Sequence, residues 1–221
     1  ALPICVYFDI NQQGMDQMMA DIVSMGGELF VMDDGWFGDK YPRKNDSSSL
    51  GDWVVDKNKL PNGIEGLLSD AKKHGVKFGI WIEPEMANTT SELYEKHPDW
   101  VLKASERDVV LGRGGTQVVL DLANPAVQDF VFGVVDNLMT SYPEIDYIKW
   151  DANMSVQNHG SQYLTKDNQS HMYIEFHRGF EKICQRIRAK YPDLTIQACA
   201  SGGGRANYGV LPYFDEFWVS D

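Results

Sequence analysis

The sequence has few cysteines, no long apolar run and no surplus of positive charge. Its three cysteines, Cys5, Cys184 and Cys199, lack metal-ligand spacing and indicate neither a disulfide framework nor a zinc site. No apolar run approaches the roughly 18 residues that a membrane span needs, and the opening residues do not have the pattern expected of a signal peptide. With 20 Lys and Arg against 32 Asp and Glu, the net charge of -12 argues against nucleic acid or an anionic membrane as a partner. We therefore expect a protein that acts on a neutral ligand, with a cytoplasmic location favoured.

What the sequence does have is a regular alternation of strand-like and helix-like segments, without a low-complexity linker. A length of 221 residues with 43% hydrophobic content suits one large α/β domain. Amphipathic periodicity predicts helices between the strands, including one that stops at Gly75 and one that begins at Asn124 and Pro125. The predicted strands span residues 3–10, 27–34, 76–84, 116–122, 145–151, 194–201 and 215–221.

This alternation predicts a parallel sheet with helical crossovers. Two architectures carry such a sheet: an open doubly wound fold and a TIM (β/α)8 barrel. A barrel takes about 250 residues. Seven strands and six crossovers in 221 residues therefore favour a barrel that stops before its eighth strand.

Polar residues gather at the carboxyl ends of the predicted strands. Because parallel strands present these ends on one face, and barrel enzymes place their sites there, we expect the side chains to converge. The residues concerned are Asp33, Asp34, Trp36, Trp81, Glu83, Glu85, Asp121, Lys149, Asp151, Asn153, the run from Cys199 to Arg205, Trp218, Ser220 and Asp221.

The chemistry of this face suits a sugar. Carboxylates accept hydrogen bonds from hydroxyl groups, and indole rings cover the apolar face of a pyranose. Glycosidases use two carboxyl groups, one as nucleophile or base and one as acid. Asp151 lies beside Lys149, whose ammonium favours the ionised form of a nucleophile, whereas Asp221 beside Trp218 has the surroundings of an acid. The SGGGR run lacks the phosphate-loop pattern and indicates a turn whose amides approach a sugar hydroxyl.

Eight motifs in order resemble the catalytic barrel of the glycoside hydrolase family 36 α-galactosidases, the melibiases. The resemblance extends from about residue 28 to the end of the sequence. The motifs are FVMDDGWFG, SLGDW, FGIWIEPEM, HPDWVL, VVLDLANP, DYIKWDAN, CASGGGR and WVSD.

The resemblance implies retaining hydrolysis of a terminal α-1,6-linked galactose, as in melibiose or raffinose, without a metal or cofactor. It implies that Asp151 is the nucleophile and Asp221 the general acid/base. Asp33 and Asp34 match the pair that binds galactose O4 and O6, and Lys149 matches a lysine that contacts O3 and O4. The other residues with implied sugar contacts or positions in the pocket are Arg113, Asn153, Cys199, Gly202, Trp81, Trp53, Arg205 and Trp218.

Members of this family also carry an N-terminal β-sandwich and a C-terminal β domain. We therefore expect residues 1–221 to be a partial barrel domain from a longer enzyme, which as a whole is expected to be a dimer or tetramer. Raw strand edges would then make the 221 residues poorly soluble or inactive by themselves.

Three alternatives remain open from the sequence. The first is a transglycosylase of the same family, in which another sugar replaces water as the acceptor. The second is a non-catalytic barrel that binds sugar. The third is a metal-dependent barrel enzyme that uses Asp33, Glu83 and Asp121 at successive strand ends.

Overall fold

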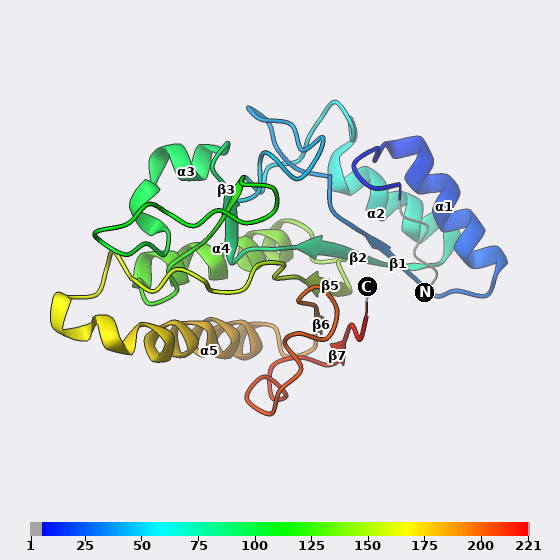
Figure 1. Ribbon diagram of the computed structural model, residues 1–221. Coiled ribbons are helices and arrows are strands. Elements are labelled where there is room, and N and C mark those ends of the chain that lie inside the picture. The colour runs from blue at the N-terminus through cyan, green and yellow to red at the C-terminus, as the bar shows by residue number, and fades with distance from the viewer. Residues whose placement is uncertain (1–5, 221) are drawn as a thin grey trace.

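A computed structural model describes residues 6–220 of the chain, and within them five parallel strands form the central sheet (Figure 1). The order across the sheet is β1-β2-β5-β6-β7, so each strand of this sheet pairs with the one that follows it in the chain. In β2 every residue after the first is buried, as is typical of a parallel strand covered on both faces. The five strands are β1 (Leu29–Met32), β2 (Lys77–Ile82), β5 (Tyr147–Trp150), β6 (Thr195–Ala198) and β7 (Glu216–Phe217).

Helices lie between these strands and pack in pairs, α1 against α2 and α4 against α5. The sequence sets several of their ends. The side chain of Asn124 accepts a hydrogen bond from Ala126 N before Pro125 begins α4. Gly75 adopts the left-handed conformation that ends α2. The helices are α1 (Gln12–Ser24), α2 (Gly63–His74), α3 (Glu92–Lys96), α4 (Pro125–Ser141) and α5 (Met172–Lys190), with short 3-10 segments η1 (Pro98–Trp100) and η2 (Lys166–His171).

The strand predicted at 116–122 exists but belongs to a different sheet. β4 (Gln117–Val119) pairs antiparallel with β3 (Met86–Asn88), apart from the central sheet. A parallel neighbour needs a crossover of a dozen or more residues, usually helical. Between β3 and β4 the longest helix is the five-residue α3, so the chain turns back on itself. The prediction of a fourth parallel strand is wrong.

The first predicted strand, 3–10, is also not observed where the structure can be described. Residues 3–5 lie outside the described residues. Tyr7 has a positive φ of 49°, and Asp9 N donates to Val6 O at 3.1 Å, which closes a turn. A strand cannot run through this conformation. The described residues thus have an α/β fold with a mostly parallel sheet, and no helix among them is long and apolar enough to cross a membrane.

Candidate active site

The carboxyl ends of the five parallel strands bring most of the sequence-predicted site residues to one edge of the sheet. Asp33 and Asp34 follow β1, Glu83 follows β2, and Asp151 follows β5. Cys199 and Gly202 follow β6, and Trp218 follows β7. We call this edge the carboxyl edge.

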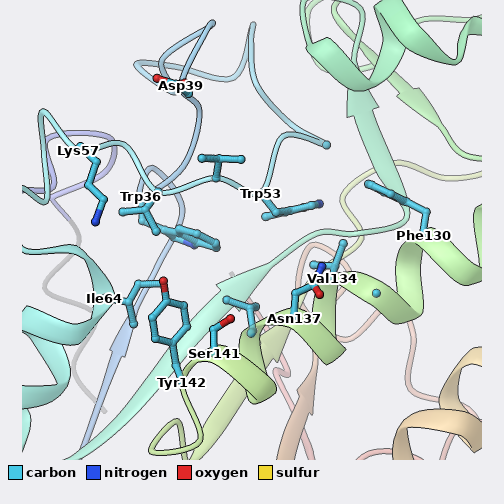
Figure 2. A pocket seen from close by; sticks show the side chains of 15 residues that line it. Trp36, Asp39, Trp53, Lys57, Ile64, Phe130, Val134, Asn137, Ser141 and Tyr142 are labelled. Atoms are coloured by element: carbon cyan, nitrogen blue, oxygen red, sulfur yellow. The ribbon is translucent and has the colours of Figure 1, made fainter.

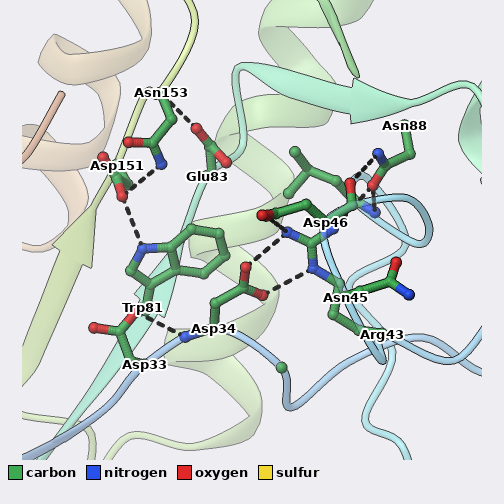
Figure 3. Close-up of polar contacts among 12 residues, drawn as sticks. Asp33, Asp34, Arg43, Asn45, Asp46, Trp81, Glu83, Asn88, Asp151 and Asn153 are labelled. Atoms are coloured by element: carbon green, nitrogen blue, oxygen red, sulfur yellow. Dashed lines mark hydrogen bonds and ion pairs between the residues drawn. The ribbon is translucent and has the colours of Figure 1, made fainter. Parts of the chain in front are cut away.

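Asp151, the predicted nucleophile, is enclosed, with 6% of its surface exposed. Its Oδ2 accepts hydrogen bonds from Trp81 Nε1 at 3.1 Å and Asn153 Nδ2 at 2.7 Å, and its Oδ1 accepts one from Ala152 N at 2.9 Å (Figure 3). Three donors from two strand ends therefore fix the orientation of the carboxylate.

Asn153 links this carboxylate to the glycine-rich turn after β6. Its Oδ1 accepts hydrogen bonds from Ser201 N at 3.2 Å and Ser201 Oγ at 2.8 Å. Gly202, next along the turn, has a φ of 90°, a conformation that favours glycine. Burial and the nearby Asp151 carboxylate raise the pKa of the Cys199 thiol to about 12, so the thiol stays protonated. The turn and the nucleophile candidate thus form one connected wall.

Lys149 brings a positive charge to the same edge from within β5. Its Nζ pairs with Asp33 Oδ2 at 2.8 Å and lies 4.9 Å from the centroid of the Trp218 ring. Burial lowers the pKa of Lys149, but the ion pair with Asp33 outweighs it, so the pKa lies above its ordinary value. The ammonium is therefore charged at all ordinary pH values.

Asp34 is held by a residue that the sequence-based prediction missed. The guanidinium of Arg43, which is fully buried, binds both oxygens of the Asp34 carboxylate (Figure 3). Burial raises the pKa of Asp34 above its ordinary value, although Arg43 acts in the opposite direction. An arginine in a loop rich in Ser, Asn and Asp reads as exposed, so the sequence offers no local signal of this role.

Glu83 is a second residue absent from the predicted contact set. It is 1% exposed and accepts a hydrogen bond from the backbone N–H of Asn153. Burial, and next the charge of Asp151, raise the pKa of Glu83 to about 8. Its carboxyl is therefore protonated at neutral pH beside the nucleophile candidate. Its place at the end of β2 was the available signal.

Arg205 and Trp53 lie behind the contacts just described. Arg205 Nη2 pairs with Glu85 Oε1 at 2.5 Å, and its guanidinium packs on the rings of Phe180 and Phe214. Trp53 packs against Trp81 with ring centroids 6.2 Å apart. It also lines a cavity of about 650 Å³ between the chain segment that follows β1 and helix α4, together with Trp36, Ile64, Phe130 and Tyr142 (Figure 2).

Arg113 and Asp221 complete the predicted set. Arg113 is exposed, with a φ of 47°, and lies near enough to Glu83 for its charge to oppose the rise in the pKa of Glu83. Asp221, predicted as the acid/base, lies outside the described residues.

The metal-dependent alternative finds no ligand cluster. Asp33 pairs with Lys149, Glu83 accepts from Asn153, and Asp121 accepts from Ser161. Asp121 follows β4, which is not a strand of the central sheet, so the prediction that it ends a parallel strand is also wrong. From residue 6 to residue 220, no group of three His, Cys, Asp or Glu side chains could hold a metal ion.

The carboxyl edge therefore has hydrogen-bond acceptors, the ammonium of Lys149 and indole rings around the enclosed carboxylate of Asp151. Such an arrangement can bind several hydroxyl groups of a sugar and bring a carboxylate to its anomeric carbon.

Comparison with known proteins agrees with this chemistry. The family model described as Melibiase matches residues 4–221. The chain is 41% identical to a probable alpha-galactosidase C of Aspergillus flavus, over 98% of this chain and 28% of that protein. It is 39% identical to the alpha-galactosidase AgaA of Geobacillus stearothermophilus, over 97% of this chain and 29% of that protein.

Solved structures show the same similarity in three dimensions. The alpha-galactosidase from Lactobacillus brevis superimposes with a TM-score of 0.92 at 39% identity, over 98% of this chain and 28% of that one. A variant of AgaA in complex with raffinose superimposes with a TM-score of 0.92 at 37% identity, over 99% and 30% of the two chains. The chain thus spans less than a third of the length of the relatives that it matches.

Proposed function

The chain belongs to the melibiase family, and from this premise we propose that it forms the catalytic centre of an α-galactosidase. The protein removes terminal α-linked galactose from small galactosides such as melibiose and raffinose, with retention of the anomeric configuration. Its sheet is part of a (β/α)8 barrel, and residues 1–221 lie within that domain. The parallel strands and the gathering of polar side chains at their carboxyl edge support this architecture.

The observation that carries the proposal is the setting of Asp151. Its carboxylate is enclosed, oriented by Trp81 and Asn153, and flanked by Lys149 from its own strand. A nucleophile must be aimed before substrate arrives, and these hydrogen bonds fix the orientation of the Asp151 carboxylate.

The reaction proceeds by two displacements. Asp151 attacks the anomeric carbon, the glycosidic bond breaks, and Asp221 gives its proton to the leaving oxygen. Water then attacks the galactosyl ester from the face that the leaving group vacated, Asp221 takes the proton from this water, and Asp151 is released.

The remaining predicted residues bind and orient the sugar. Asp33, Asp34 and Lys149 take the hydroxyl groups at O3, O4 and O6. Trp53 and Arg205 support neighbouring side chains from behind. Direct contacts or pocket walls are assigned to Trp81, Arg113, Asn153, Cys199, Gly202 and Trp218.

Proton NMR of the full-length protein with raffinose tests the proposal. We expect α-galactose to be the first product, with the β anomer appearing only by mutarotation. Release of β-galactose first would exclude the two-step mechanism, and no release would exclude hydrolysis. Galactosylated raffinose as the main product at high raffinose concentration would make the protein a transglycosylase instead.

A further inference from the structure

Arg43 is a charged side chain with no exposed surface, in the loop between β1 and α2. Burying a guanidinium costs several kcal/mol unless hydrogen bonds and an opposite charge compensate for the lost water. The structure supplies both. Arg43 Nη1 donates to Ser48 O at 2.9 Å and Asn88 Oδ1 at 3.0 Å, while Nε and Nη2 point to Asp34.

The contact with Asp34 is a two-point fork. Nε donates to Oδ1 at 3.0 Å and Nη2 donates to Oδ2 at 2.7 Å. Two parallel hydrogen bonds fix the plane of the carboxylate as well as its position. One acceptor direction on each oxygen remains for a ligand, and the Asp34 side chain is 19% exposed toward solvent.

The fork is itself immobilised by its surroundings. Asn88, which is fully buried in β3, holds Arg43 and also accepts a hydrogen bond from Leu50 N at 2.9 Å. The rings of Phe8 and Phe37 lie 5.3 and 5.6 Å from the guanidinium carbon. Figure 3 shows the chain of contacts from Asn88 through Arg43 to Asp34, beside Trp81.

The carboxylate of the neighbouring Asp33 is held differently from that of Asp34. Asp33 meets Lys149 at one oxygen and the backbone N–H of Asp34 at the other, at 2.8 Å each, and its side chain is 44% exposed. An ammonium on a flexible stem holds it on one side, whereas both prongs of a buried planar guanidinium hold Asp34. The two consecutive aspartates are therefore held by different kinds of donor at the same edge.

We propose that Arg43 is a positioning residue that keeps Asp34 as a fixed acceptor for one sugar hydroxyl, and so sets which hydroxyl pattern the site accepts. The inference rests on the proposed α-galactosidase function and deepens it. A carboxylate locked in one plane accepts from a hydroxyl in one direction, so a sugar without that hydroxyl, or with it inverted, leaves a buried acceptor unpaired. Without the guanidinium, a buried carboxyl takes up a proton and then offers a donor in its place.

Kinetics with deoxy substrates test this in the full-length protein. The substrates are 4-nitrophenyl α-galactoside and its 4-deoxy and 6-deoxy analogues. Asp34→Asn identifies the hydroxyl that Asp34 reads, because discrimination against one analogue falls. We expect Arg43→Lys to lower discrimination against the same analogue by about 10- to 100-fold, mainly through KM for the parent substrate. In the Asp34→Asn background, Arg43→Met should cost less than threefold further in kcat/KM.

Two further variants separate positioning from folding. Asp34→Glu leaves Arg43 intact but moves the carboxylate out of the fork, and should lose the same discrimination. Arg188→Lys is the control, because Arg188 also binds a carboxylate, that of Asp215 at 2.6 Å, and two backbone carbonyls. It should lower the melting temperature without changing discrimination between the substrates.

Each result decides a different question. Folded Arg43→Lys or Asp34→Glu protein that discriminates as the wild type does would overturn the role of Arg43 and leave the enzyme an α-galactosidase. A wild-type protein that hydrolyses none of the galactosides would overturn the proposed function and this inference with it.

Discussion

The same strands form both ends of the parallel sheet, but the polar side chains at the two ends differ in burial. At the carboxyl edge, Asp151, Glu83 and Arg43 have almost no exposed surface. Asn153 binds both Asp151 and Glu83, and Arg43 binds Asp34. At the amino end, Asp146 is exposed and accepts from Phe78 N at 3.2 Å, and Tyr147 donates to Glu216 at 2.8 Å. A cavity of about 580 Å³ lies there too, so a hollow alone does not distinguish the ends.

This difference indicates which end of the sheet is suited to catalysis. Exposed ion pairs contribute little to stability and can be lost at small cost. A buried charge is costly to keep and is strongly destabilising when its partner is removed. The carboxyl edge retains several such groups, and perturbed titration in an enclosed site is typical of catalysis.

The sharpest test of the contrast replaces the two aspartates that flank β5. Asp151→Asn should lower kcat on 4-nitrophenyl α-galactoside by about ten-thousand-fold or more, because the nucleophile is gone. Asp146→Asn, at the other end of the same strand, should leave kcat within twofold. Equal losses in steady-state assays would mean that the two ends do not differ in function.

A second test compares two lysines. Lys149→Met removes the charge that holds Asp33 and should lower kcat/KM by about 100-fold, as expected for a charged hydrogen bond to the sugar and its carboxylate. Lys77, exposed at the start of β2, serves as the control. A Lys77→Met variant that loses as much activity would contradict the assignment of binding to the carboxyl edge.

The third test uses pH. Because the pKa of Glu83 is raised from 4.5 to about 8, the folded state binds this proton more tightly than the unfolded chain does. The resulting stabilisation is complete below pH 4.5, declines as pH rises, and is lost above about pH 8. Glu83→Gln should therefore show a smaller fall in melting temperature across this window than the wild type.

The same measurement on Asp151→Asn adds a second test, because the charge of Asp151 is the second cause of the raised pKa of Glu83. In Asp151→Asn the upper limit of the window should move to lower pH. If the melting temperatures of wild type and Glu83→Gln run parallel from pH 4.5 to 8, Glu83 does not titrate as described.

The smallest effect is expected at the amino end. Tyr147→Phe removes the hydrogen bond to Glu216 and should lower the free energy of unfolding by about 1 kcal/mol. Its kcat/KM should equal that of the wild type. Denaturant titration and steady-state kinetics on one preparation measure both, and a tenfold loss of activity would extend the functional region beyond the carboxyl edge.

Each of the five strands of the central sheet lies within a strand predicted from the sequence. The apolar runs among them carry the local signature of a buried parallel strand. The sequence could not predict that residues 117–119 pair antiparallel, because the apolar pattern of a strand does not depend on the direction of its neighbour. The short connection after β3 sets the partner. The first predicted strand is not observed because Tyr7 has a positive φ, and the periodicity of side chains does not indicate this backbone angle.

The candidate site was predictable where residues lie at the end of a strand, as Lys149 does in β5, or directly follow one, as Asp33 and Asp151 do. Arg43 was not, because its burial depends on Asp34 and on Asn88, which is 45 residues away in sequence. Charge in a polar loop is ordinarily solvated, and only the folded contacts reveal an exception.

The most direct test of the central claim is to trap the covalent intermediate. Full-length protein is treated with a mechanism-based galactosyl fluoride, digested, and the modified peptide is identified by mass spectrometry. We expect one galactosyl group per active site, on the Asp151 carboxylate. A label on Asp34 or Glu83, or turnover without any label on Asp151, would contradict the claim that the enclosed carboxylate at the end of β5 is the nucleophile.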